Sequence, residues 1–340
     1  MFRNEEEFVA LIRSVAALEG GHPRERRVER KKGVELGIGD DAALVTARKG
    51  HDVILTADMS IEAVHFSRRL HPPAAVGHRA LARSLSDVAA MGGVPRYALV
   101  SLAISRGVER HWVSEFYGGM QRLGSRFDVQ IVGGDTAIVP GRIFIDVLVA
   151  GEVPKGKALR RSGARAGDQI YVSGVLGLSA LGFHLLKNKG SRLPRSAKAA
   201  AREAIQAHLH PEPQCALGRF LSERRLASAA MDLSDGLSTD LARLCAASGV
   251  GARLWAAKIP RPELPGAATP LQLALDGGED YQLLFTVPPR KAPRLPRRFQ
   301  GRDLHPIGEI EASRGIRLVM PEGKAVRLEP AGWDHFRQAR

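Results

Sequence analysis

The sequence predicts a mixed α/β (α+β) protein built from two domains. Short apolar runs rich in β-branched residues, each of strand length, alternate with longer stretches in which apolar residues recur at helical spacing. Strands and helices that interleave in this way are typical of α/β proteins. With 340 residues and 44% hydrophobic side chains, the chain is long enough to form two hydrophobic cores.

The first half of the chain supplies an N-terminal α/β domain, which we expect to span residues 1–150. Apolar runs bounded by glycine and aspartate predict strands at 34–38, 53–56, 97–104, 129–132 and 143–150. Helical spacing of apolar residues predicts helices at 74–91 and 108–123.

The second half supplies a C-terminal α/β domain, which we expect to span residues 151–340. It opens with a linker predicted at 151–167, where glycine, lysine and arginine gather. Further strands are predicted at 169–173, 227–231, 281–287 and 316–320, and helices at 176–187, 197–208 and 237–247.

Composition excludes several classes of protein. The sequence holds no run of about eighteen apolar residues, and its first residues carry three consecutive glutamates where a secretory signal would carry positive charge. We therefore expect a cytoplasmic protein without a membrane partner. Cys215 and Cys245 are the only cysteines, too few for a disulfide framework or a thiolate metal site.

The net charge of +14 raises the question of nucleic acid, since basic domains bind phosphates by releasing counterions. The basic residues are scattered, and their densest runs, 24–32 and 290–302, show no helical recognition pattern. We expect a solvated, arginine-rich surface that binds no nucleic acid. A basic nucleic-acid-binding protein remains the alternative from a different functional class.

Acidic residues recur beside glycines or where an apolar strand ends. Asp87 lies on an expected helix, and five other segments show the pattern: 37–41, 55–58, 133–136, 231–236 and 277–280. Each segment alone is typical of a helix cap or an Asx-turn. Gathered together, such carboxylates repel one another unless cations neutralise them, and oxygen ligands without cysteine favour Mg²⁺ or Ca²⁺. The glycines let backbone N–H groups approach phosphates closely.

Other nucleotide and hydrolase motifs are missing from the sequence. It lacks G-x-x-x-x-G-K-[ST], the protein-kinase H-R-D and D-F-G set, and G-x-S-x-G. The stretch 37–39 opens like a dinucleotide fingerprint but runs into Asp40 and Asp41, which would repel a pyrophosphate unless metal bridged them.

The acidic segments, together with 62–66, 85–92 and 332–336, resemble in content and order the motifs of the thiamine-monophosphate kinases. The resemblance covers nearly the whole chain. It implies the fold shared with aminoimidazole ribonucleotide synthetase, with an N-terminal domain that pairs across a homodimer. It also implies an enzyme that uses ATP and several Mg²⁺ ions to convert thiamine monophosphate to thiamine diphosphate.

The resemblance also implies roles for individual residues. It assigns the metal ligands to Asp41, Thr56, Ala57, Asp58, Asp87, Asp135, Asp232 and Asp235. It assigns ATP contacts to Tyr117, Gly134, Asp135, Arg161 and Ser234, and thiamine phosphate contacts to His65, Glu279 and Trp333. Ala57 stands where the family usually has a hydroxyl residue, so it would ligate through its backbone carbonyl. Ala63 stands where glycine is common.

No catalytic general base is expected. The attacking phosphate of thiamine monophosphate has a second pKa of about 6 and is mostly ionised at neutral pH. Charge neutralisation and in-line alignment by Mg²⁺ then suffice for direct transfer. Other ATP-dependent enzymes of the same superfamily, such as a purine-pathway synthetase, a hydrogenase-maturation protein or a selenophosphate synthetase, remain alternatives. The last two normally need a cysteine or selenocysteine at positions where this chain has none.

Overall fold

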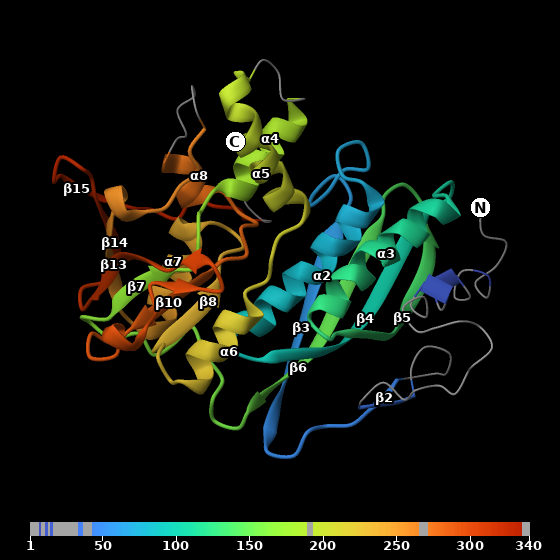
Figure 1. The fold of residues 1–340 in the computed structure, drawn as a ribbon, viewed down its shortest axis with the longest axis horizontal. Coiled ribbons are helices and arrows are strands. Elements are labelled where there is room, and N and C mark those ends of the chain that lie inside the picture. The colour runs from blue at the N-terminus through green and yellow to red at the C-terminus, as the bar shows by residue number, and fades with distance from the viewer. Residues whose placement is uncertain are drawn as a thin grey trace. The chain divides into compact units, whose positions relative to one another are not determined.

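The computed structural model describes residues 33–36, 43–188, 193–264 and 271–334, together with residues 7, 11, 12, 14 and 15 of an N-terminal helix. The chain divides into two compact units (Figure 1). Unit 1 comprises Met1–Val88 and Val94–Lys155, and unit 2 comprises Ala89–Gly93 and Gly156–Arg340. Each unit is described by itself.

Unit 1 is a four-stranded sheet with two helices on one face (Figure 1). The strand order is β3-β6-β4-β5, in which β6 runs antiparallel to both neighbours and β4 runs parallel to β5. The strands are β3 (His51–Ile61), β4 (Val94–Ser105), β5 (Gln130–Val139) and β6 (Phe144–Pro154), and the helices are α2 (Pro73–Ala90) and α3 (Arg110–Arg126). A separate antiparallel pair is formed by β1 (Val34–Leu36) and β2 (Leu44–Val45).

Two glycines let α2 and α3 approach closely. A Cβ atom added to Gly77 would lie 1.9 Å from the Phe116 carbonyl oxygen, and one added to Gly119 would lie 1.9 Å from the Ala74 carbonyl oxygen. Because each glycine meets the other helix's backbone, any side chain at either position would push the helices apart.

Strand β3 has two chemically distinct faces. Ile54 and Ser60 are buried, and Thr56 and Asp58 between them are half-buried. The alternate residues are exposed, including Leu55 at 68% and Met59 at 53%. Successive side chains of a strand point to opposite faces. Thr56, Asp58 and Ser60 therefore lie on one face of β3, and the apolar row that contains Leu55 and Met59 lies on the other.

Unit 2 is built on a seven-stranded sheet of order β15-β14-β9-β13-β7-β10-β8, in which only the β14–β9 pairing is parallel. The strands are β7 (Gln169–Val172), β8 (Ala229–Asp232), β9 (Gly251–Trp255), β10 (Leu283–Val287), β13 (His305–Glu311), β14 (Gly315–Val319) and β15 (Ala325–Arg327). The helices are α4 (Leu178–Lys187), α5 (Lys198–Leu209), α6 (Cys215–Glu223), α7 (Leu237–Ser248) and α8 (Leu271–Asp276). Apolar side chains of α7 join those of the sheet in one core.

The mixed α/β class and the predicted helices are confirmed, because α2, α3, α4, α5 and α7 lie where helical spacing places them. Two local predictions are wrong. Residues 55–58 and 133–135 do not lie at strand ends or in turns: β3 pairs with β6 along all eleven of its residues, and β5 continues to Val139 beside β4. The linker begins later than predicted, because β6 continues to Pro154.

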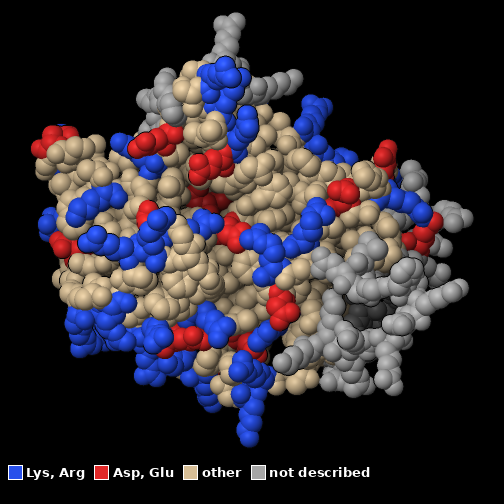
Figure 2. Space-filling view, in the orientation of Figure 1, with Lys and Arg blue, Asp and Glu red and all other residues tan. Residues whose placement is uncertain are grey.

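Basic side chains are spread over the visible face of the molecule, with acidic side chains between them (Figure 2). Among the helices that the structure describes, none is both long enough and apolar enough to cross a bilayer.

Candidate active site

The predicted site residues lie on both units, except Asp41, which is outside the described residues. Unit 1 carries Thr56, Ala57, Asp58, His65, Asp87, Tyr117, Gly134 and Asp135. Unit 2 carries Arg161, Asp232, Ser234, Asp235, Glu279 and Trp333.

On unit 1, three oxygen-bearing residues meet where α2 packs on β3. Thr56 and Asp58 are two residues apart on one face of β3, and the Thr56 hydroxyl donates a short hydrogen bond to the Asp87 carboxylate on α2. Burial, and then the neighbouring Asp87 carboxylate, raise the pKa of Asp58 to about 6. Arg83, whose Nε lies 3.8 Å from Asp58 Oδ1, opposes that rise only in part. The cluster therefore carries more negative charge than its own cation neutralises.

The donor set of this cluster fits Mg²⁺. It consists only of carboxylate and hydroxyl oxygens, which Mg²⁺ prefers, and a cation there would relieve the repulsion between Asp58 and Asp87. Among the described residues, no group of three His, Cys, Asp or Glu side chains is placed to hold a metal ion. The remaining ligands would have to be water or phosphate oxygens, which is usual for Mg²⁺ in phosphate-binding sites.

Asp135 lies apart from this cluster. Two strands, β6 and β4, separate β5 from β3, so the backbones are about 14 Å apart at a strand spacing of about 4.8 Å. Within one chain, Asp135 therefore cannot ligate the same ion as Asp58. The preceding Gly134 has φ +151°, and a Cβ there would lie 1.9 Å from the Val100 carbonyl oxygen, so only glycine fits. The Asp135 carboxylate accepts the Thr136 N–H at 2.8 Å.

The three other predicted residues of unit 1 differ in their surroundings. Ala57 is exposed on the opposite face of β3. Tyr117 is in the core, 3% exposed, with its ring edge-on to Phe116, and burial raises its pKa. His65 accepts the Ile61 N–H through Nδ1 at 3.0 Å, and it lines a cavity of about 10 Å³, room for about one water molecule.

On unit 2, the loop between β8 and α7 is shaped by a carboxylate that the sequence analysis missed. Asp240, fully buried in the first turn of α7, accepts the Ser234 N–H at 3.1 Å and the Asp235 N–H at 2.9 Å. Burial raises the pKa of Asp240 to about 6, although the Asp235 N–H and Arg243 oppose the rise. The sequence feature that could have identified Asp240 is its position as an acidic residue in the first turn of a predicted helix.

Asp235 already has a cationic partner. Arg243 Nη1 lies 2.5 Å from Asp235 Oδ2 and 2.8 Å from Asp240 Oδ1. A metal ion bound by Asp235 would share this carboxylate with Arg243. Asp232 is buried at the end of β8, just before the loop.

The loop carrying Glu279 is fixed from two sides. The Glu279 N–H donates to the Ser234 carbonyl oxygen at 2.8 Å. On the other side, the buried Asp280 carboxylate accepts the N–H groups of Gly177 at 2.6 Å and Ser179 at 3.0 Å, where α4 begins. Glu279 has φ +65°, which is unusual for a residue with a side chain. Strain of this kind concentrates at functional sites.

Trp333 also lies beside the 232–236 loop. Its backbone N–H donates to the Asp235 carbonyl oxygen at 3.0 Å, and the residue is 50% exposed. Hydrogen bonds therefore bring Ser234, Asp235, Glu279 and Trp333 together. Arg161 is not among them: its carbonyl oxygen accepts the Ser248 hydroxyl at the other end of α7, and its side chain is exposed.

Comparison with known families covers both units. The model of the AIR synthase related protein N-terminal domain matches residues 39–153, and that of the C-terminal domain matches residues 165–321. E. coli HypE, a hydrogenase maturation protein, shares the fold with a TM-score of 0.73 at 20% sequence identity.

Relatives that are nearer in sequence are thiamine-monophosphate kinases. The Salmonella typhimurium enzyme is 38% identical over 89% of this chain and 92% of its own length, and the Bacillus subtilis enzyme is 34% identical over 89% and 94%. The structure of AaThiL complexed with AMPPCP and TMP has a TM-score of 0.74 at 32% identity and covers 99% of both chains. The crystal structure of the enzyme from Stenotrophomonas maltophilia K279a has a TM-score of 0.77 at 32% identity, covering 93% of this chain and 95% of its own. On this similarity along nearly its whole length, the chain belongs to the thiamine-monophosphate kinase family of enzymes, within the AIR synthase related proteins.

Proposed function

We propose that this chain transfers the γ-phosphate of ATP to thiamine monophosphate and so forms thiamine diphosphate and ADP. The observation that carries the proposal is the full-length similarity to a relative whose structure holds AMPPCP together with TMP. Each unit carries carboxylates that can hold cations, and cations are what two phosphorylated ligands require, because they neutralise the repulsion between the two anions.

Mg²⁺ is the cation that we propose for this site. On unit 1, Thr56, Asp58 and Asp87 would hold it, and the raised pKa of Asp58 supports a place for a cation there. The family resemblance implies several Mg²⁺ ions, and the further ligands proposed from it are Asp41, Ala57 through its carbonyl oxygen, Asp135, Asp232 and Asp235. Of these, Asp135 would ligate a different ion from Asp58. When bound, Mg²⁺ supplies neutralisation and alignment of the phosphates.

Direct in-line transfer is the mechanism that we propose. The acceptor phosphate is mostly ionised at neutral pH because its second pKa is about 6, so it needs no residue to remove a proton. The protein's part is to orient both phosphates and exclude water. We therefore assign no catalytic base to any side chain.

The organic parts of the substrates would be held mostly by unit 2. Trp333 offers a half-exposed ring for stacking on a thiamine ring, and Glu279, beside it, offers a carboxylate for the cationic or aminopyrimidine part. His65 remains a third proposed thiamine contact. For ATP we keep Tyr117, Gly134, Asp135, Arg161 and Ser234 as proposed contacts; the burial of Tyr117 makes it the least accessible of these in unit 1.

We also propose that two copies pair through the open face of the unit 1 sheet. The support is the exposed apolar row of β3, with Val53 at 60% and Leu55 at 68%, on the strand face opposite Thr56 and Asp58. Apolar rows this exposed usually mark an interface. The cytoplasmic location and the lack of nucleic-acid binding stay predictions.

The test is to incubate the protein with MgATP and thiamine monophosphate and to quantify both products. Thiamine diphosphate and ADP in a one-to-one ratio, with no product when EDTA removes the metal, is the expected result. ADP without thiamine diphosphate would reject the proposed acceptor and would favour another ATP-dependent enzyme of the superfamily.

A further inference from the structure

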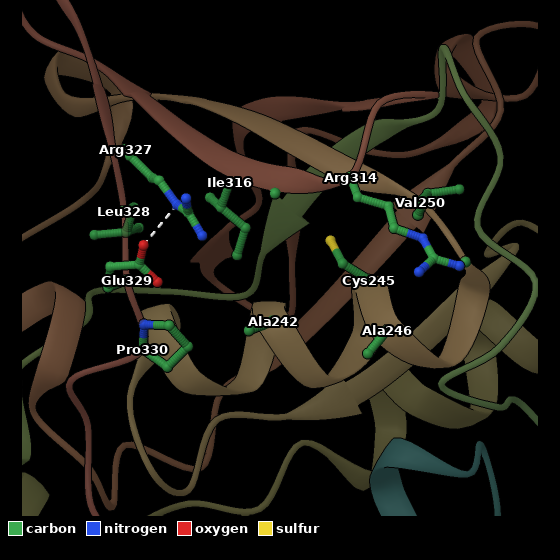
Figure 3. Close-up of a pocket in the computed structure, with 12 residues that line it drawn as sticks. Ala242, Cys245, Ala246, Val250, Arg314, Ile316, Arg327, Leu328, Glu329 and Pro330 are labelled. Carbon is green, nitrogen blue, oxygen red and sulfur yellow. Dashed lines mark ion pairs between the residues drawn. The ribbon is translucent and has the colours of Figure 1, made fainter.

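A pocket of about 300 Å³ lies within unit 2, beside α7, β14 and the chain that follows β15 (Figure 3). None of the predicted site residues lines it. Its walls are largely apolar: Ala242, Cys245 and Ala246 come from α7, while Ile316 and Leu328 come from the opposite side. A space of this size is at the lower end of the range for small-molecule sites.

The charged residues of the pocket select the ligand. Arg314 and Arg327 lie towards its two ends (Figure 3). Arg327 pairs with Glu329 at 2.5 Å, whereas Arg314 has no hydrogen-bond or ion-pair partner among the described residues. One guanidinium beside an apolar wall therefore remains available to a ligand. We propose that this pocket binds a small organic anion with a compact apolar body and one carboxylate, which Arg314 pairs with.

The remaining lining residues agree with reversible binding. Burial raises the pKa of the Cys245 thiol to about 12, so the thiol stays neutral and acts as an apolar wall and not as a nucleophile. The rim is open at Gly249 and Gly315, because a Cβ added at either glycine would meet no atom within 4 Å. A ligand therefore has a way in.

The pocket is connected to the candidate active site by the C-terminal strap, which we define as residues 327–333. At the pocket, the Leu328 N–H donates to the Ile316 carbonyl oxygen at 2.9 Å. At its other end, the Gly332 N–H donates to Thr239 Oγ1 at 3.0 Å, and the Trp333 N–H donates to the Asp235 carbonyl oxygen at 3.0 Å. An occupant of the pocket thus contacts the segment that positions Trp333.

Binding is tested on the full chain with naphthalene-2-carboxylate as the probe and its neutral amide as the charge control, by calorimetric titration. We expect a Kd of about 0.1 to 1 mM for the carboxylate, as is usual for a ligand of this size, and weaker binding of the amide. Arg314→Gln is expected to weaken carboxylate binding by about fivefold or more, whereas Arg302→Gln, which removes a charge outside the pocket, leaves it unchanged.

Two neighbouring alanines on α7 allow a test of whether filling the pocket blocks binding, with one as the control for the other. Ala246 and Ala247 are both exposed, but only Ala246 lines the pocket. Ala246→Phe is expected to weaken probe binding by at least about tenfold by filling the space, and Ala247→Phe to leave it unchanged. Circular dichroism confirms that both variants fold. Equal binding by the two variants, or no saturable binding by the unaltered protein, would overturn the proposed site.

The link between the pocket and Trp333 through the C-terminal strap is tested by a separate measurement. With 5-fluorotryptophan at the three tryptophans, the ¹⁹F resonance assigned by Trp333→Phe is expected to shift as the probe saturates the pocket. A shift absent in Ala246→Phe and present in Ala247→Phe supports the connection. A resonance that stays in place at saturation overturns it. Neither result depends on kinase activity.

Discussion

The Thr56 hydroxyl donates a hydrogen bond to the Asp87 carboxylate and so joins β3 to α2. Thr56 shares its strand face with Asp58, whose pKa rises to about 6 because it is buried near Asp87. Strand alternation and helix packing thereby bring two carboxylates and a hydroxyl together from segments 31 residues apart. This is the part of unit 1 on which the proposed chemistry depends.

Loss of the Asp87 charge should stop turnover without unfolding the protein. Asp87→Asn keeps the shape and an acceptor for Thr56 but removes a charge that would hold Mg²⁺. We expect thiamine diphosphate formation to fall by about 100-fold or more, with Tm within about 3 °C of the unaltered protein.

Asp52→Asn is the matched control for Asp87→Asn. Asp52 is exposed on β3, the strand that carries Thr56 and Asp58, and belongs to no proposed site. The Asp52→Asn substitution should leave the rate of thiamine diphosphate formation unchanged. Near-normal turnover by Asp87→Asn at saturating Mg²⁺ would remove Asp87 from the proposed ligands.

The positive φ of Glu279 predicts that two substitutions at this position will differ in stability but not in their effect on KM. Glu279→Gly relieves the strain of φ +65° and should be about 1 kcal/mol more stable than Glu279→Ala. Both variants lose the carboxylate, so both should raise the KM for thiamine monophosphate to a similar extent. Urea unfolding and steady-state kinetics measure the two effects, and equal stability of the two variants would contradict the strain argument.

Asp280 predicts how stability depends on pH. Burial raises its pKa from 3.8 to about 7, although hydrogen bonds from Gly177 and Ser179 oppose the rise. The folded protein thus holds this proton more tightly than the unfolded chain does. The stabilisation is complete below pH 4 and is lost as the pH rises through about 7.

The comparison of Asp280→Asn with the unaltered protein isolates this effect. Between pH 5 and 7, the unfolding free energy of the unaltered protein should fall by about 1 kcal/mol per pH unit relative to that of Asp280→Asn. The exposed Glu322→Gln serves as a control and should follow the unaltered protein. Parallel curves for all three proteins would show that Asp280 does not titrate in this range.

Leu55 tests the proposed pairing of two copies. Leu55→Lys places a charge in the exposed apolar row of β3 and should convert a dimer into monomers in sedimentation experiments. Phe183→Lys changes an exposed apolar residue on unit 2 and should leave the dimer intact. If the unaltered protein sediments as a monomer, the open face of the sheet has another use.

The sequence alone predicts the structure correctly where the helical or strand periodicity of its side chains determines that structure. Helical spacing placed Asp87 on α2, and strand alternation accounts for the shared face of Thr56 and Asp58. Strands β2, β9, β13 and β15 are among those that escaped prediction. Strand β13 contains Pro306 and Gly308, which are typical of loops, and its register with β7 shifts between them. In β9 an arginine interrupts a short apolar run that begins with glycine.

Long-range pairing limited the prediction of the site. Local sequence places a glycine turn at 133–135, but β4 pairs with this stretch and keeps it in a strand with Gly134 at positive φ. Likewise, the position of Asp240 in the first turn of α7 indicates a cap, but nothing local shows that Arg243 reaches both Asp235 and Asp240. Such contacts depend on how a helix is seated and not on its own pattern.

The proposed cation site at Asp58 and Asp87 is tested by Mn²⁺ binding, with Mn²⁺ replacing Mg²⁺, followed by electron paramagnetic resonance in the presence of AMPPCP. We expect Asp58→Asn combined with Asp87→Asn to weaken the protein-dependent Mn²⁺ binding by about tenfold or more. Binding by the double variant that matches the unaltered protein would contradict the proposed cation site.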